Sequence, residues 1–241
     1  MMRVQCLFFF VVVLFTVAFW CFLLPRRPLP SNTRSVQLKT EQKSFDDIKI
    51  IDKDLYFIHI PKNAGTYFAA NFCNKKKSPG HRLLKSYPKY IQERSVAIVR
   101  NPYSRLVSLY RYARLKNSMY HKNGSHRHFA FASAHSFDSF VRALYTGKLK
   151  HDIHSLPQSE FIMVGNKCPC KHILRFESLN QDIVEKLGLN LDNFSKKKIN
   201  VATDSPWKQF YQHKDTILLV NKLYKEDFDH FSYEMMNESI H

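Results

Sequence analysis

Hydrophobic and polar positions divide the chain into an uncharged N-terminal run, a polar stretch and a long segment of mixed pattern. Residues 6–24 carry no charge, whereas residues 25–49 are rich in Pro, Ser, Thr, Gln and charged residues. From residue 50 onward, short apolar runs alternate with stretches that have helical spacing of apolar residues. Short runs rich in aromatic and β-branched residues are typical of buried strands. The pattern predicts one α/β domain over residues 50–241.

The first strand-to-helix unit lies in the stretch Leu55-Tyr-Phe-Ile-His-Ile-Pro-Lys-Asn-Ala-Gly-Thr-Tyr67. Its apolar part predicts a buried strand that stops at Pro61, and residues 66–73 can form a helix. The turn between them contains Lys62. Such a unit favours an anion, because the first free N–H groups of a helix and its dipole attract negative charge.

The residues of this turn indicate a phosphate ligand. Lys62 supplies a point charge, and the Thr66 hydroxyl supplies a donor. Ala64 and Gly65 leave the space that a backbone needs to approach a phosphate closely. The Gly-Lys pair of the nucleotide triphosphatase loop G-x-x-x-x-G-K-[ST] is missing, which argues against that class. An ordinary strand-to-helix turn with an exposed lysine is the alternative.

A second unit follows in the run Ser95-Val-Ala-Ile-Val-Arg100, which predicts another strand. Pro102 suits the first turn of a helix, and apolar residues recur at helical spacing from Leu106 onward. Arg100 falls at the carboxyl end of the strand, where open α/β sheets bind ligands. Its guanidinium can bind a phosphate bidentately.

Both units resemble the membrane-bound carbohydrate sulfotransferases, the group that includes heparan sulfate 2-O-sulfotransferase. Ile58-His-Ile-Pro-Lys-Asn-Ala-Gly-Thr66 is similar to the signature H-I-P-K-T-A-G-T-S, with Asn63 in place of Thr and Tyr67 in place of Ser. Arg100-Asn-Pro-Tyr-Ser-Arg-Leu-Val-Ser108 is similar to the pattern V-R-N-P-x-x-R-L-V-S-x-Y. Weaker similarity extends the resemblance over residues 53–235.

The resemblance implies an α/β fold with three layers, a mainly parallel central sheet and a P-loop-like nucleotide-binding architecture. It also implies the donor 3′-phosphoadenosine 5′-phosphosulfate, from which a sulfuryl group passes to a glycan hydroxyl by in-line displacement without a metal. The residues that it places around the 5′-phosphosulfate are Lys62, Asn63, Ala64, Gly65, Thr66 and Tyr67, and those around the 3′-phosphate are Arg100 and Ser108.

Two residues, Lys62 and His81, are expected to take part in the chemical step. A sugar hydroxyl is a weak nucleophile at neutral pH, and histidine has the pKa of a suitable general base. His81 lies between the two donor motifs, in a position that resembles that of the family's catalytic histidine. Lys62 is expected to stabilise the charge that grows on the leaving oxygen. The alternative bases are His59, His135, His151 and His154.

Arg105 belongs to the second motif, and four further polar residues belong to later segments that also resemble the family. Arg105, Glu177 and Asp227 are interpreted as structural, whereas Gln158 and Arg175 can reach the donor or the acceptor.

The net charge of +17 predicts an anionic partner. The sequence carries no helix-turn-helix, zinc-finger or RNA-recognition signature, so nucleic acid is not expected. A polyanionic glycan fits the charge better. The alternatives are a tyrosylprotein sulfotransferase with an acidic peptide acceptor, and a catalytically inactive glycan-binding protein of the same fold.

The uncharged run at residues 6–24 is long enough to cross a bilayer as a helix and ends in a poor cleavage site. We expect a retained signal anchor after a cytoplasmic tail (1–5), then a flexible stem (25–49) and the catalytic domain (50–241). A cleaved signal peptide is the alternative. Arg26 and Arg27 weakly oppose a lumenal domain. The resemblance and the sequons at Asn123, Asn193 and Asn237 favour it, which predicts a type II Golgi membrane protein.

Three cysteines, Cys73, Cys168 and Cys170, lie in the predicted domain. In an oxidising compartment, one cysteine of the Cys168-Pro-Cys170 pair is expected to bridge either to Cys73 or to its neighbour. Zinc is not expected, because the pair and His172 lack a second ligand cluster at suitable spacing.

Overall fold

A computed structural model of the chain describes residues 49–52, 54–73, 80–115, 127–191 and 207–237. All of them belong to one compact unit, Ser44–His241. The predicted tail and membrane anchor, and nearly all of the predicted stem, lie outside the described residues. Among the residues that are described, no helix combines the length and the apolar character needed to cross a bilayer.

The described part of the chain contains a sheet of four strands in the order β1-β2-β3-β4. These strands are β1 (Lys49–Asp52), β2 (Leu55–Ile58), β3 (Ser95–Val99) and β4 (His172–Arg175). β1 is antiparallel to β2, whereas β2, β3 and β4 run parallel to one another. The predicted mainly parallel sheet is confirmed, and the carboxyl ends of its three parallel strands share one edge.

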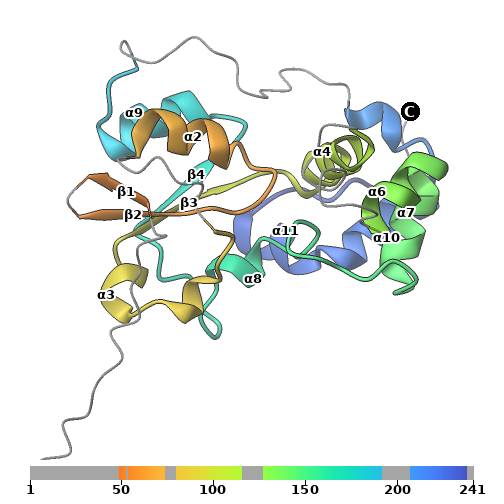
Figure 1. Ribbon diagram of the computed structural model, residues 1–241, viewed down its shortest axis with the longest axis horizontal. Coiled ribbons are helices and arrows are strands. Elements are labelled where there is room, and N and C mark those ends of the chain that lie inside the picture. Colours follow the sequence, from red (N-terminus) through yellow and green to blue (C-terminus); the bar gives the residue numbers. More distant parts are fainter. Residues whose placement is uncertain (1–48, 53, 74–79, 116–126, 192–206, 238–241) are drawn as a thin grey trace, which may run out of the picture. The chain divides into compact units, whose positions relative to one another are not determined.

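Helices cover both faces of the sheet (Figure 1). On one face, α2 (Gly65–Phe72) and α9 (Leu179–Leu187) pack Phe68 and Ile183 against buried strand residues such as Val96. On the other face lie η1 (Leu84–Ser86), α3 (Lys89–Gln92) and α8 (Ser159–Ile162). Every residue of β3 is buried, as expected for a parallel strand between two layers of helices.

The two faces separate the cysteines. Cys73 packs with the α2 and α9 face, whereas Cys168 and Cys170 pack with the opposite face. All three cysteines are thiols in the structure, so the predicted bridge remains a prediction.

Helix α4 (Pro102–Arg114) begins directly after β3 and connects the sheet to a helical part. The Asn101 side chain accepts hydrogen bonds from the N–H groups of Tyr103 and Ser104, and Pro102 fills the first helical position. Both are favourable helix-start features, because they satisfy or remove donors that have no partner within the helix. The predicted strand-to-helix unit after residue 95 is confirmed.

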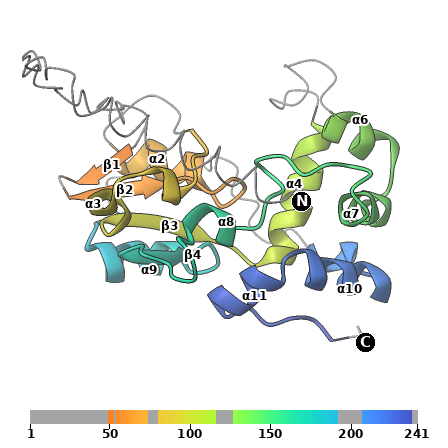
Figure 2. The same cartoon turned by 90° about the horizontal axis from the view of Figure 1, so that it is seen from below.

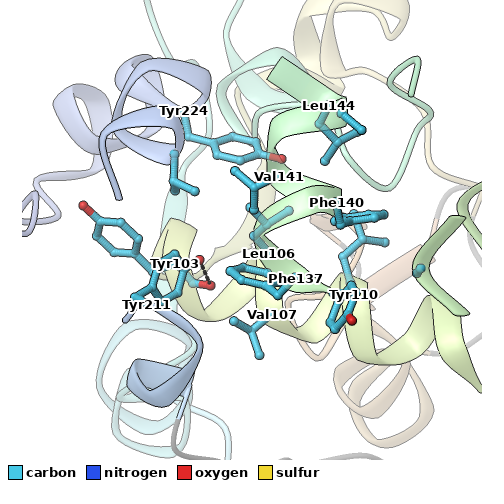
Figure 3. Close-up of a cluster of buried hydrophobic side chains, with 14 of the residues drawn as sticks. Tyr103, Leu106, Val107, Tyr110, Phe137, Phe140, Val141, Leu144, Tyr211 and Tyr224 are labelled. Carbon is cyan, nitrogen blue, oxygen red and sulfur yellow. Dashed lines mark hydrogen bonds between the residues drawn. The ribbon is translucent and has the colours of Figure 1, made fainter. Parts of the chain in front are cut away.

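The helical part has its own core, shown in Figure 3. Its further elements are α6 (Arg127–Ala134), α7 (Phe137–Tyr145), η2 (Trp207–Phe210), α10 (Lys214–Leu223) and α11 (Lys225–Phe231). Helix α4 lies between the sheet and α7 (Figure 2). Its buried Tyr103 and Tyr110 pack against Tyr211 and Phe140, and burying each such ring stabilises the fold by about 1.5–3 kcal/mol. This packing fixes the helix that carries Ser104, Arg105 and Ser108.

Candidate functional site

The turn after β2 has an unusual backbone. Lys62 and Ala64 have φ angles of 70° and 61°, in the left-handed region that non-glycine residues rarely adopt. Helix α2 starts immediately afterwards, at Gly65. The predicted order of strand, turn and helix is thus confirmed. Backbone strain of this kind concentrates at ligand-binding and catalytic turns, where surrounding contacts hold it in place.

The amino end of α2 fits an anion. Ala64 is the N-cap residue and provides no side-chain cap. The first intrahelical donor is Phe68, whose N–H bonds the Ala64 carbonyl at 3.0 Å. The N–H groups of Gly65, Thr66 and Tyr67 come before it and have no carbonyl of their own helix to bond. Thr66 is exposed, so its hydroxyl is available on the same turn.

The reason for glycine at position 65 differs from the prediction. A Cβ atom there would lie 2.0 Å from Cδ2 of His59. The space beside the Gly65 backbone is therefore filled by the His59 ring, and the expectation that this space receives a phosphate is wrong. Gly65 instead allows a histidine to pack against this turn (residues 61–65), which we name the phosphate turn after its predicted ligand.

Asn63 also differs from the prediction in its side chain. It is fully buried, and its Nδ2 donates to the Ile98 carbonyl (2.7 Å) and to Oε1 of Gln158 (2.7 Å). The side chain ties the turn to β3 and is not available to a ligand. Only the Asn63 backbone remains a candidate for donor binding.

Arg100 lies where β3 ends and is almost completely buried. Its Nε donates to Ser104 Oγ at 2.9 Å, and its Nη1 donates to the Lys62 carbonyl at 3.1 Å. The two sequence motifs therefore meet in space at neighbouring strand ends. Since a guanidinium has five N–H groups, these two bonds leave donors for a further anion.

Arg100 stays charged although it is buried. Burial lowers the pKa of its guanidinium to about 10, against the opposing effect of the Glu177 carboxylate, so the group stays charged at neutral pH. The guanidinium carbon lies 3.9 Å from the centre of the Phe176 ring. Ser108 is half-buried one helical turn beyond Ser104, on the helix that Arg100 precedes. Its contact with a 3′-phosphate remains a prediction.

Lys62 approaches α4. Its Nζ lies 3.8 Å from the centre of the Tyr112 ring, a favourable cation–π distance. Burial, together with the charges of Arg100 and Arg105, lowers the pKa of the Lys62 ammonium from 10.5 to about 7. An anion placed at the turn would favour the charged form of this lysine and raise its pKa again.

The predicted structural role of Arg105 is confirmed by its contacts. This buried guanidinium donates to three backbone carbonyls, those of Pro61, Leu156 and His154, at 2.8–3.2 Å. It therefore holds the strand end before the phosphate turn to the segment before α8.

Three histidines cluster beside the turn. The His81 ring lies 4.5 Å from the His59 ring and 5.1 Å from the His154 ring, centre to centre. His81 Nδ1 lies 3.2 Å from the His59 carbonyl oxygen. Because a carbonyl only accepts, Nδ1 must carry the hydrogen, which leaves Nε2 of the neutral ring as a proton acceptor. Burial lowers the pKa of His81, although the bond to the His59 carbonyl opposes this, so the neutral form predominates at pH 7.

The other candidate bases separate into two groups. His59 and His154 belong to the cluster, and His154 Nδ1 lies 3.7 Å from the Asp152 carboxylate. His135 is exposed at the start of α7, and its Nδ1 contacts the Phe131 carbonyl at 3.0 Å. His151 Nδ1 contacts the Ser155 carbonyl at 3.0 Å. In the described part of the chain, no group of three or more potential ligands could hold a metal ion.

Gln158 has a role that the sequence did not disclose. Its side chain donates to the Arg100 carbonyl and accepts from the Arg100 N–H, both at 2.8 Å. Its own N–H and that of Ser159 donate to the carboxylate of Asp227, each at 2.8 Å. Gln158 thus fixes the backbone of Arg100 and does not itself face a ligand, while Asp227 is structural as predicted.

Glu177 and Arg175 support the same strand ends. Glu177 accepts from the Asn101 N–H at 2.8 Å and from the Tyr233 hydroxyl at 2.9 Å, which confirms its structural role. Arg175 donates to the Phe231 carbonyl and lies over the Tyr233 ring, so its contacts are with the C-terminal segment. Tyr112, whose ring contacts Lys62, was not predicted as a site residue. It lies one helical turn beyond Ser108 on α4.

The described residues form an α/β protein with a mainly parallel sheet and two cationic side chains at adjoining strand ends, an arrangement typical of anion sites. A sequence model described as the Sulfotransferase family matches residues 50–234, which is most of the chain. The protein belongs to this sulfotransferase family. Comparison with curated proteins and with solved structures gave no match.

Proposed function

We propose that the protein transfers a sulfuryl group from 3′-phosphoadenosine 5′-phosphosulfate to a hydroxyl of a glycan. The family supports sulfuryl transfer in general. The observation that carries the donor assignment is the hydrogen bond from Arg100 Nη1 to the Lys62 carbonyl, which joins the two phosphate motifs. Two cationic side chains at adjoining strand ends suit a nucleotide with phosphates at both its 3′ and 5′ positions.

The residues present fit this co-substrate. The amino end of α2, Lys62 and Thr66 would hold the 5′-phosphosulfate, while Arg100 and Ser108 would hold the 3′-phosphate. When bound, the donor supplies a sulfuryl group on a phosphate leaving group. The charge that develops on the leaving oxygen is stabilised by Lys62 in its protonated form.

His81 acts as the general base in this proposal. Nε2 accepts the proton of the acceptor hydroxyl while the hydroxyl oxygen attacks sulfur, since Nδ1 is committed to the His59 carbonyl. The lowered pKa of His81 keeps the ring neutral and therefore able to accept. A series of side-chain contacts supports this pairing of Lys62 with His81: Lys62 lies over the Tyr112 ring, Tyr112 stacks with His154, and His154 contacts His81.

A polyanionic glycan is the acceptor class that the net charge of +17 favours. The same proposal includes a retained N-terminal anchor and a lumenal domain in the Golgi. Asn237, one of the three sequons, is exposed, whereas Asn123 and Asn193 lie outside the described residues.

The test is transfer of labelled sulfate from the donor to a panel of sulfated, uronic-acid-containing and neutral glycans and tyrosine-containing acidic peptides. Label on a glycan that disappears in Lys62→Ala supports the proposal. Label on peptide tyrosine favours a tyrosylprotein sulfotransferase. Glycan binding without any label favours an inactive glycan-binding protein and overturns the enzyme assignment.

A further inference from the structure

A largely buried carboxylate, that of Asp152, lies beside the histidine cluster in the segment between α7 and α8. Its Oδ1 accepts from the N–H groups of His154 and Ser155 at 3.0 and 3.1 Å. The Asp152 N–H in turn donates to Ser155 Oγ at 2.8 Å. These bonds within one short turn fix the position of the carboxylate.

The Asp152 carboxylate faces two histidines. His154 Nδ1 lies 3.7 Å from Oδ2, and His128 Nδ1, on α6, lies 3.9 Å from Oδ1. The His128 ring is completely buried, and its Nε2 lies 3.0 Å from the Lys150 carbonyl. Burying a carboxylate is costly unless polar or positive groups face it, and these two rings surround the charge on separate sides.

The His154 ring connects Asp152 to the proposed base. It meets the His81 ring edge to face, with centres 5.1 Å apart and an angle of 71° between the planes. It also stacks with the Tyr112 ring of α4 at 6.4 Å, and the His154 carbonyl accepts from Arg105 at 3.2 Å. Both the ring and the backbone of His154 are therefore held beside His81.

The groups that face His81 have opposing effects on its charge. Burial lowers its pKa, and so do the charges of His154 and of Arg105 on α4, whereas the His59 carbonyl at the end of β2 and the Asp152 carboxylate raise it. When His81 takes the proton of the acceptor, a positive charge appears near Arg105. A carboxylate in the same neighbourhood favours that protonated ring.

We propose that Asp152 is a positioning residue for the base, which balances the positive charge that His81 gains and holds the His154 ring between them. The inference rests on the proposed function, in which His81 is the base. In the chemical step the O–H bond of the acceptor breaks and an N–H bond forms at His81 Nε2. Asp152 itself stays ionised and takes no proton.

The test is Asp152→Asn, which keeps an oxygen to accept from His154 and Ser155 but removes the charge. Histidine-labelled full-length chain in detergent is titrated by NMR, and the His81 signal is assigned by its loss in His81→Ala. His81 should titrate at a lower pH than in wild type, and kcat should fall about 10- to 100-fold.

A purely structural role predicts the opposite direction. If the loss of Asp152 only loosened the turn, water would reach His81 and its pKa would rise towards the usual 6.5. A titration of His81 that is unchanged or moved to higher pH in Asp152→Asn therefore overturns the proposal, and so does a wild-type kcat in that variant.

Two further variants separate the charge from other effects. Asp138→Asn is the matched control, because it removes a carboxylate that lies 3.8 Å from another histidine, His213, on the helical part. It should leave the His81 titration and kcat at their wild-type values, and a shift equal to that of Asp152→Asn overturns the proposal. Asp152→Glu keeps the charge, so His81 should titrate close to its wild-type pH; a clearly lower pH overturns the role of the charge.

The titration needs neither donor nor acceptor. Absence of sulfuryl transfer by the wild-type protein would therefore count against the proposed function, while the His81 titration would still decide whether Asp152 acts on this ring.

Discussion

The ammonium group of Lys62 lies 3.8 Å over the ring of Tyr112, so the lysine of the phosphate turn is held against α4. In this position it is largely removed from water, and its pKa falls to about 7. An anion at the turn would reverse this effect, because an opposite charge nearby favours the protonated amine. Ligand binding and protonation of Lys62 are therefore coupled.

This coupling predicts proton uptake when the nucleotide binds. With a pKa of about 7, Lys62 is about nine-tenths neutral at pH 8 in the free protein, whereas the phosphates of adenosine 3′,5′-bisphosphate are fully ionised there. Binding at pH 8 should then take up close to one proton, and affinity should fall as the pH rises above about 7. Calorimetry in two buffers of different ionisation enthalpy measures the uptake.

The matched control is Lys62→Met, which keeps a long side chain over Tyr112 but cannot take up a proton. We expect the uptake at pH 8 to disappear in this variant. The same uptake in Lys62→Met and wild type would show that another group is responsible.

Arg100 should recognise the 3′-phosphate. Arg100→Ala removes charge-assisted hydrogen bonds, so the affinity for adenosine 3′,5′-bisphosphate should fall about 10- to 100-fold. Adenosine 5′-phosphate, which lacks the 3′-phosphate, provides the ligand-side control and should lose much less affinity. Comparable losses for both nucleotides, measured by calorimetry, would place Arg100 outside the 3′-phosphate site.

His81→Ala should lower kcat by about 10²- to 10⁴-fold, because it removes the proposed base. Thermal unfolding and nucleotide affinity should change little, since His81 is half-buried and its ring nitrogen bonds the His59 carbonyl, which precedes the turn. His135→Ala, at an exposed histidine that was an alternative base, is the control and should keep wild-type kcat. Full activity in His81→Ala would transfer the role to His59 or His154.

The assignment of His81 as the base also predicts how kcat of the wild-type protein depends on pH. Burial lowers the pKa of His81, so the base stays deprotonated down to a pH below its usual 6.5. The rate kcat should therefore be independent of this group at neutral pH and fall only on the acid side. A profile of kcat against pH for wild type, with saturating donor, measures that acid limb; an acid limb above pH 6.5 would contradict a buried, neutral His81.

Local pattern was sufficient to predict the two strand-to-helix units. Pro61 and Pro102 mark where the strands end and where a helix begins, and the buried runs between them determine which residues enter the sheet. The meeting of Lys62 with Arg100 also followed, since parallel strands place their carboxyl ends at the same edge.

The remaining features of the site depend on contacts between distant parts of the chain. Gln158 reaches Arg100 across 58 positions, and Asn63 reaches Gln158 across 95. A local sequence pattern cannot predict contacts between such distant residues. The sequence therefore assigned Asn63 to the ligand, whereas its side chain points into the protein. Gly65 was misinterpreted for the same reason, because the residue that requires its small size is a histidine of the preceding strand end.

The neighbouring residues Ala64 and Gly65 should differ in how their substitution changes stability and kcat. In Gly65→Ala the new Cβ would lie 2.0 Å from the His59 ring, so the ring must move, and His81 packs on that ring. We expect a loss of stability of about 1–3 kcal/mol together with a lower kcat. Ala64→Gly removes a left-handed alanine, so its stability should stay within about 1 kcal/mol of wild type, on the stabilising side, with kcat maintained. Denaturant unfolding and steady-state rates of both variants measure this contrast. Equal effects of the two exchanges would mean that the turn tolerates a methyl group at position 65, and that His59 does not link the phosphate turn to the base.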